Sequence, residues 1–195
     1  IRVDTISQEL RGVSTATIKE YIRYFEEANL IYRSEQLDVQ GKKMLKAKNK
    51  IYLTDCGIRW AVVPGVDVFK KETELGFAAE TMVYKHIRDY YDALPEKYRV
   101  GYLQDERGLE IDVAIQDFGQ DKPLQYVEVK MRTQSAIRDK DAIVAYGLQG
   151  HPGYIITKGH DDFGLSERGK TSLYRFPVGA FLYMMGQMLD RLNRQ

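Results

Sequence analysis

Two short stretches late in the chain, residues 109–115 and 126–130, place the strongest constraint on its fold. They read Leu-Glu-Ile-Asp-Val-Ala-Ile and Tyr-Val-Glu-Val-Lys, so apolar and polar side chains alternate in both. A period of two is typical of strands with one buried and one polar face. If the two strands lie side by side, Asp112, Glu128 and Lys130 share one surface of a sheet.

The segments around these strands predict an α/β domain over residues 61–195. Apolar side chains at Phe77, Val83 and Ile87 indicate one face of a long helix. Turn-forming residues separate the strands, and residues 55–73 are expected to be a loop-like connector. The expected elements are a helix over 74–91, strands over 99–103, 109–115 and 124–131, a helix over 136–148, strands over 153–157 and 172–176, and a terminal helix after Pro177. This αβββαβ order predicts a mixed sheet.

Residues 1–60 have the pattern of a winged helix-turn-helix. A short helix over 4–10 and a glycine turn precede Ser14, which is placed to cap a second helix ending near Ala28. Strands beginning at Leu30 and over 50–54 then enclose a lysine-rich hairpin. The usual first helix of this fold would precede Ile1, so we expect the module to be truncated at its N-terminus.

A winged helix places its second helix in the major groove and its wing on phosphate. Residues 1–60 hold 11 Lys and Arg against 8 Asp and Glu, whereas the remainder holds 18 against 20. Glu20, Glu26 and Glu27 on the second helix favour the alternative of a protein-interaction module. The candidate DNA contacts are Ser14, Thr15, Thr17, Lys19 and Arg23 on the helix, with Lys42, Lys43, Lys46, Lys48 and Lys50 on the wing.

Composition excludes some classes of protein. Hydrophobic residues make up 44% of the 195 residues and the net charge is +1, as in an ordinary globular protein. No apolar run approaches the ~20 residues of a membrane span, and no signal peptide is visible. The lone Cys56 excludes an internal disulfide and fits a reducing compartment. We therefore expect a cytoplasmic protein.

The predicted sheet surface has the chemistry of a phosphodiester-cleaving metal site. Asp112 and Glu128, with a backbone carbonyl such as that of Val129, would ligate Mg²⁺ or Mn²⁺. Lys130 would orient or deprotonate water, or neutralise the phosphate. The alternative is an ordinary lattice of ion pairs on solvent-facing strands. Glu110 shares the face of Asp112 and is expected to be a solvated neighbour rather than a ligand.

Asp112 followed sixteen residues later by Glu128-Val-Lys130 resembles the PD-(D/E)xK nuclease superfamily, which has a restriction-endonuclease-like fold. The resemblance adds Glu80 as the helix carboxylate that binds a second ion or a metal-bound water. The chain is also similar to DUF4143, the C-terminal half of certain prokaryotic AAA-type ATPases. That likeness rests on four segments, residues 50–57, 110–112, 127–130 and 176–182. It implies an upstream ATPase, and because no P-loop motif occurs here, ATP would bind only in that missing domain.

Two main hypotheses follow. In the first, a metal-dependent nuclease domain is directed to DNA by its winged helix and coupled to an upstream ATPase. In the second, a catalytically inactive nuclease-fold module recognises DNA or protein for that ATPase. A transcription-factor-like binder is a third, weaker possibility. Oligomers are possible in each case, and no membrane partner is expected.

Overall fold

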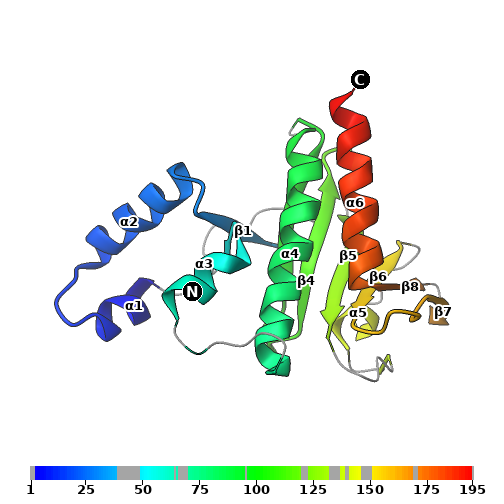
Figure 1. The fold of residues 1–195 in the computed structure, drawn as a ribbon, viewed down its shortest axis with the longest axis horizontal. Helices are drawn as coiled ribbons and strands as arrows, with labels where there is room; N and C mark the ends of the chain where they lie inside the picture. The colour runs from blue at the N-terminus through cyan, green and yellow to red at the C-terminus, as the bar shows by residue number, and fades with distance from the viewer. Residues whose placement is uncertain are drawn as a thin grey trace.

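The fold is a mixed α/β arrangement built on one sheet (Figure 1). This computed structural model describes residues 3–38, 49–63, 65, 70–94, 96–119, 123–131, 137–138, 141–145, 151–168 and 171–194. Eight strands follow the order β2-β1-β3-β4-β5-β6-β8-β7. Their bounds are β1 (Ile31–Leu37), β2 (Lys50–Leu53), β3 (Tyr98–Gln104), β4 (Glu110–Asp117), β5 (Pro123–Lys130), β6 (Gly153–Thr157), β7 (Gly164–Arg168) and β8 (Thr171–Pro177). Strands β3, β4 and β5 form the expected antiparallel run, and β6 and β8 continue it in parallel.

Six helices are described, and three of them cover the two faces of the central sheet. The six helices are α1 (Val3–Glu9), α2 (Thr15–Glu27), α3 (Cys56–Val62), α4 (Glu72–Asp92), α5 (Ala142–Ala145) and α6 (Val178–Asn193). The three that cover the sheet are α4, α5 and α6. Figure 1 shows α4 and α6 side by side across one face. Helix α5 packs against β4 and β5 from the opposite face. Among the described helices, none has the length and apolar character that a membrane crossing requires.

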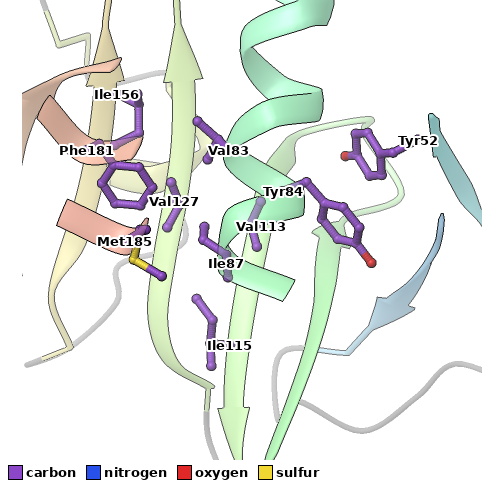
Figure 2. Close-up of a cluster of buried hydrophobic side chains, with 10 residues drawn as sticks. All are labelled: Tyr52, Val83, Tyr84, Ile87, Val113, Ile115, Val127, Ile156, Phe181 and Met185. Atoms are coloured by element: carbon purple, nitrogen blue, oxygen red, sulfur yellow. The ribbon is translucent and has the colours of Figure 1, made fainter. Parts of the chain in front are cut away.

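The α4–α6 face of the sheet holds the larger buried cluster (Figure 2). Val83 and Ile87 of α4 meet Val113 of β4 and Val127 of β5, and Phe181 of α6 closes the layer. A second cluster on the α5 face contains Ile111, Ile143 and Leu173. The sheet is therefore buried on both faces at its centre, which anchors β4 and β5 between two helical layers.

The N-terminal segment contains the elements expected of it. Ser14 Oγ accepts a hydrogen bond from the backbone N–H of Thr17 at 3.1 Å, which caps α2. Strand β1 pairs antiparallel with β2. Beyond Ser34, β1 pairs in parallel with β3, so the hairpin is continuous with the central sheet. Assignment of this segment as a winged helix, and the domain boundary near residue 60, stay predictions.

The structure corrects two expectations and leaves one only partly described. Residues 55–73 are not simply a loop, because Asp55 accepts the N–H of Gly57 at 2.6 Å and starts α3. Strand β7 was not expected, since its exposed, polar sequence pairs only with β8 at the edge of the sheet. Of the helix expected over 136–148, α5 is present, and much of the remainder lies outside the described residues. The other predicted strands and helices are confirmed to within a few residues.

Candidate functional site

Asp112 reaches the α4 face of the sheet because β4 contains a bulge. Register with β3 shifts so that Asp112 and Val113 together oppose Tyr102. As a result Ile111 packs on the α5 face while Val113 packs on the α4 face, although regular alternation would put both on the same side. Asp112 Oδ2 accepts the backbone N–H of Val129 at 2.8 Å, just beyond the last residues that pair β4 with β5. The carboxylate therefore caps the fork where these strands separate.

Three carboxylates from two elements meet at the ammonium of Lys50. Its Nζ lies 2.9 Å from Glu80 Oε1, 2.6 Å from Glu110 Oε1 and 3.6 Å from Asp112 Oδ1. The hydroxyl of Tyr52, two residues along β2, donates to the same Glu80 oxygen at 2.8 Å. We call the three carboxylate residues Glu80, Glu110 and Asp112 the acidic cluster, and Lys50 lies at its centre. The Lys50 side chain is only 19% exposed, so its charge depends on these partners.

Glu128 and Lys130 form a separate pair on the α5 face. Glu128 Oε1 forms an ion pair with Lys130 Nζ, and Glu128 Oε2 accepts the backbone N–H of Ile143 at 3.2 Å. Lys130 also lies 3.6 Å from Asp141. The structure therefore brings Glu80 and Asp112 together through Lys50, and Glu128 together with Lys130. The two groups meet at the fork, where Val129 separates Glu128 from Lys130 in sequence and donates to Asp112.

Two groups at this site, the carboxyl of Asp112 and the ammonium of Lys50, have shifted pKa values. Burial, reinforced by the charge of Glu80, raises the pKa of Asp112 to about 7, although Lys50 and the Val129 N–H oppose this shift. Burial would lower the pKa of Lys50, but Glu80, Asp112 and Glu110 outweigh it and raise that pKa. Perturbed carboxylates of this kind are concentrated at functional sites.

An open groove of about 530 Å³ borders the acidic cluster. Residues of β2 and α4 form most of its lining, and Arg59 of α3 and Glu110 of β4 complete it. Arg59 is held by a bidentate pair with Glu74, at 2.8 Å for each hydrogen bond. Glu80 and Glu110 can thus be reached from solvent through this groove.

The cluster fits a cation, and in this arrangement the cation is an ammonium. Three carboxylate groups approach a single point, which is the donor chemistry that Mg²⁺ and Mn²⁺ prefer. Among the described residues, however, no three His, Cys, Asp or Glu side chains are grouped closely enough to hold a metal ion as they stand. Glu80, Glu110 and Asp112 supply suitable oxygens, spaced here around Lys50.

Sequence reasoning missed Lys50 and Glu110 as members of the site. Lys50 was assigned to the wing with the other lysines, yet its ammonium points into the acidic cluster. Glu110 was expected to be solvated, and it instead makes the shortest of the three ion pairs. The alternation of Lys50 and Tyr52 on one strand was the available signal, since both side chains reach Glu80.

The candidate DNA-binding side chains of α2 are only partly free. Thr15, Lys19 and Arg23 are exposed. Arg23 pairs with Glu27 at 3.2 Å on the helix surface. The hydroxyls of Ser14 and Thr17 lie 2.9 Å apart and take part in the helix cap. Lys42, Lys43, Lys46 and Lys48 lie outside the described residues.

Fold and site together define an α/β protein with a mixed sheet and a carboxylate–lysine cluster at a strand fork. The family described as "Domain of unknown function (DUF4143)" matches residues 75–177, which is more than half of the chain. The chain belongs to this family. Residues 2–69 are similar to a second family, "Domain of unknown function (DUF8612)".

One curated relative is an "Uncharacterized protein" from Haemophilus influenzae, 36% identical over 56 residues. The aligned part is 29% of this chain and 14% of that protein, so the chain spans a small part of the relative's length. No solved structure gives a significant match.

Proposed function

We propose that this chain is a metal-dependent nuclease domain that hydrolyses phosphodiester bonds of DNA. The observation that carries the proposal is the approach of Glu80, Glu110 and Asp112 to one cation position at the fork beside Glu128 and Lys130. The order of these residues resembles the PD-(D/E)xK superfamily, whose restriction-endonuclease-like fold we propose for this domain. The acidic cluster opens on a groove, as a polymeric substrate would require.

Asp112 and Glu80 would hold the divalent ion, with Glu110 as a further oxygen donor. Glu128, the other metal ligand expected from the sequence, instead binds Lys130 and the Ile143 N–H in this arrangement. A bound Mg²⁺ or Mn²⁺ would activate a water and neutralise charge on the phosphate. Lys130 is held between Glu128 and Asp141, so its charge is fixed in place for a phosphate oxygen.

DNA binding is part of the same proposal. Helix α2 exposes Lys19 and Arg23 on a surface suited to phosphate contacts. The upstream AAA-type ATPase implied by the resemblance would supply the ATP-dependent step, and the chain itself would carry no nucleotide site. We also propose that the protein is cytoplasmic, as its composition suggests.

Cleavage of single-stranded and duplex DNA in Mg²⁺ or Mn²⁺ tests the proposed activity. Asp112→Asn should slow cleavage at least about 100-fold, because the amide cannot supply an anionic ligand. Asp117→Asn is the matched control on the same strand, where Asp117 caps a turn by accepting the Gly119 N–H at 2.8 Å. It should stay within about twofold of the wild type. Circular dichroism checks that both variants fold, and equal cleavage by wild type and Asp112→Asn would contradict the proposal.

A non-catalytic recognition module is the second candidate. The observation in its favour is that Lys50 and Lys130 already form ion pairs with carboxylates of both groups, and that the described residues hold no ready three-ligand metal group. This function predicts DNA binding by wild type and Asp112→Asn alike, with no metal-dependent cleavage by either.

A further inference from the structure

Lys50 occupies the point at which the acidic cluster would hold a metal ion. Its Nζ contacts carboxylate oxygens of Glu80, Glu110 and Asp112 at 2.6 to 3.6 Å. The ammonium also lies 5.3 Å from the centre of the Tyr102 ring and 6.0 Å from that of Tyr52. These rings and carboxylates surround much of the charge and form a cage for one cation that is open toward the groove.

A divalent ion and the ammonium cannot share this cage. Mg²⁺ requires oxygens at about 2.0–2.1 Å and Ca²⁺ at about 2.3–2.6 Å. Nζ already lies at the common point of the three carboxylates, so an ion bound at that point would take its place. The two cations would also repel each other in a site with little water to screen them. One must leave before the other enters.

Replacement of the ammonium by a divalent ion is favoured by charge, and the Lys50 side chain has a path out of the cluster. When all three carboxyl groups are ionised, one ammonium leaves two negative charges uncompensated, whereas a divalent ion in its place leaves one. Lys50 is the first residue of β2, which is the edge strand of the sheet. The groove of about 530 Å³ opens beside it and is lined by Lys50 itself, so the side chain can swing into solvent.

We propose that Lys50 is an internal counter-ion that competes with the divalent metal for the acidic cluster, and that metal binding expels its ammonium into the groove. The identity of the competing ion rests on the proposed nuclease function. The competition itself rests on the position of Lys50. The domain would therefore have a resting form, with the ammonium of Lys50 among the three carboxylates, and a metal-loaded form.

Isothermal titration of the purified chain with Mn²⁺ tests the competition. Lys50→Met removes the charge but keeps a side chain of similar length, so Mn²⁺ should bind at least tenfold more tightly than to the wild type. Lys85→Met is the matched control, because Lys85 lies on α4 and pairs with Asp89 at 2.8 Å outside the cluster. It should bind Mn²⁺ as the wild type does. Equal or weaker binding by Lys50→Met would overturn the proposal.

Lysine acetylation of the wild type provides a second readout that needs no variant. A brief pulse of acetylating reagent, followed by peptide mass spectrometry, measures how accessible each lysine is. Saturating Mn²⁺ should raise acetylation of Lys50 at least threefold and leave Lys85 unchanged. If Mn²⁺ binds without raising the reactivity of Lys50, the lysine does not leave the cluster and the proposal is wrong.

The two measurements separate this inference from the nuclease hypothesis. Tighter Mn²⁺ binding by Lys50→Met without any DNA cleavage would support the competition and count against the nuclease. Cleavage that requires Asp112, together with unchanged Mn²⁺ binding by Lys50→Met, would support the nuclease and count against the competition.

Discussion

At the scale of single residues, the environment of Asp112 decides its chemistry. The side chain is 15% exposed and lies near Glu80, so its ionised form is disfavoured. Lys50 and one backbone N–H compensate for only part of this. A carboxyl group with these neighbours holds a proton close to neutral pH, and a bound cation would release it.

The raised pKa of Asp112 predicts that this residue makes the fold less stable as pH rises. Its carboxyl binds a proton more tightly in the folded state than in the unfolded chain, where the pKa is about 3.9. Its contribution is therefore complete below about pH 4 and is lost as pH rises toward about 7. Because Asn cannot ionise, the stability of wild type relative to Asp112→Asn should fall by at least about 1 kcal/mol between pH 4.5 and 8. Urea denaturation of both proteins across this range measures their free energies of unfolding. If the wild type became more stable relative to Asp112→Asn as pH rises, the raised pKa of Asp112 would be contradicted.

At the scale of elements, the junction of β1 with β3 joins the N-terminal hairpin to the central sheet. Gly101 makes this junction possible, because a Cβ there would lie 2.5 Å from Glu35 O and 2.8 Å from Leu37 Cγ. The first of these contacts is with the backbone, which cannot rotate away. The hairpin that carries Lys50 is therefore positioned by a residue on a different strand.

Gly101→Ala should destabilise the protein by about 1–3 kcal/mol, because the added methyl group forces β1 and β3 apart. Gly76→Ala is the contrasting variant, since a Cβ at Gly76 in α4 meets nothing within 4 Å. It should be neutral or stabilising by up to about 1 kcal/mol, because alanine is the better helix former. Thermal and chemical denaturation give both values, and equal stability of the two variants would show that the junction tolerates a side chain.

At the scale of the whole molecule, helices α1 and α2 stand to one side of the sheet, away from α4 and α6 (Figure 1). Helix α2 packs on α1 and on β1. Strand β1 connects this pair to the edge strand that carries Lys50. The surface proposed to bind DNA and the acidic cluster are thus linked through one pair of strands.

Replacing both Lys19 and Arg23 by Glu should weaken binding to duplex DNA of any sequence. If each residue contacts one phosphate, the slope of log affinity against log salt should decrease by about two. Fluorescence anisotropy at several salt concentrations measures this slope. Arg191→Glu with Arg194→Glu, at the far end of α6, is the charge-matched control and should leave the slope unchanged. An unchanged slope in the α2 variant would exclude this helix from the DNA surface.

Local sequence patterns were sufficient to predict the central strands and the long helix that packs on them. Alternation in residues 109–115 and 126–130 predicted β4 and β5, and the apolar stripe on residues 74–91 predicted α4, because burial of one face dictates these periods. Such local patterns also gave the antiparallel run β3–β5 and the capped helix α2. Short or polar elements such as α3 and β7 carry too little periodicity to be found this way.

The pairing of charged side chains depends on contacts between distant segments, which local sequence does not reveal. Lys50 lies thirty residues before Glu80 and sixty before Glu110, and no local pattern links them. A bulge in β4 turns Asp112 toward α4, whereas Glu128 and Lys130 lie on the α5 face. The three side chains that were predicted to share one surface therefore lie in two neighbouring groups. Periodicity fixes which side of its own strand a residue occupies. Register shifts and strand order fix its partners, and these depend on packing across the whole sheet.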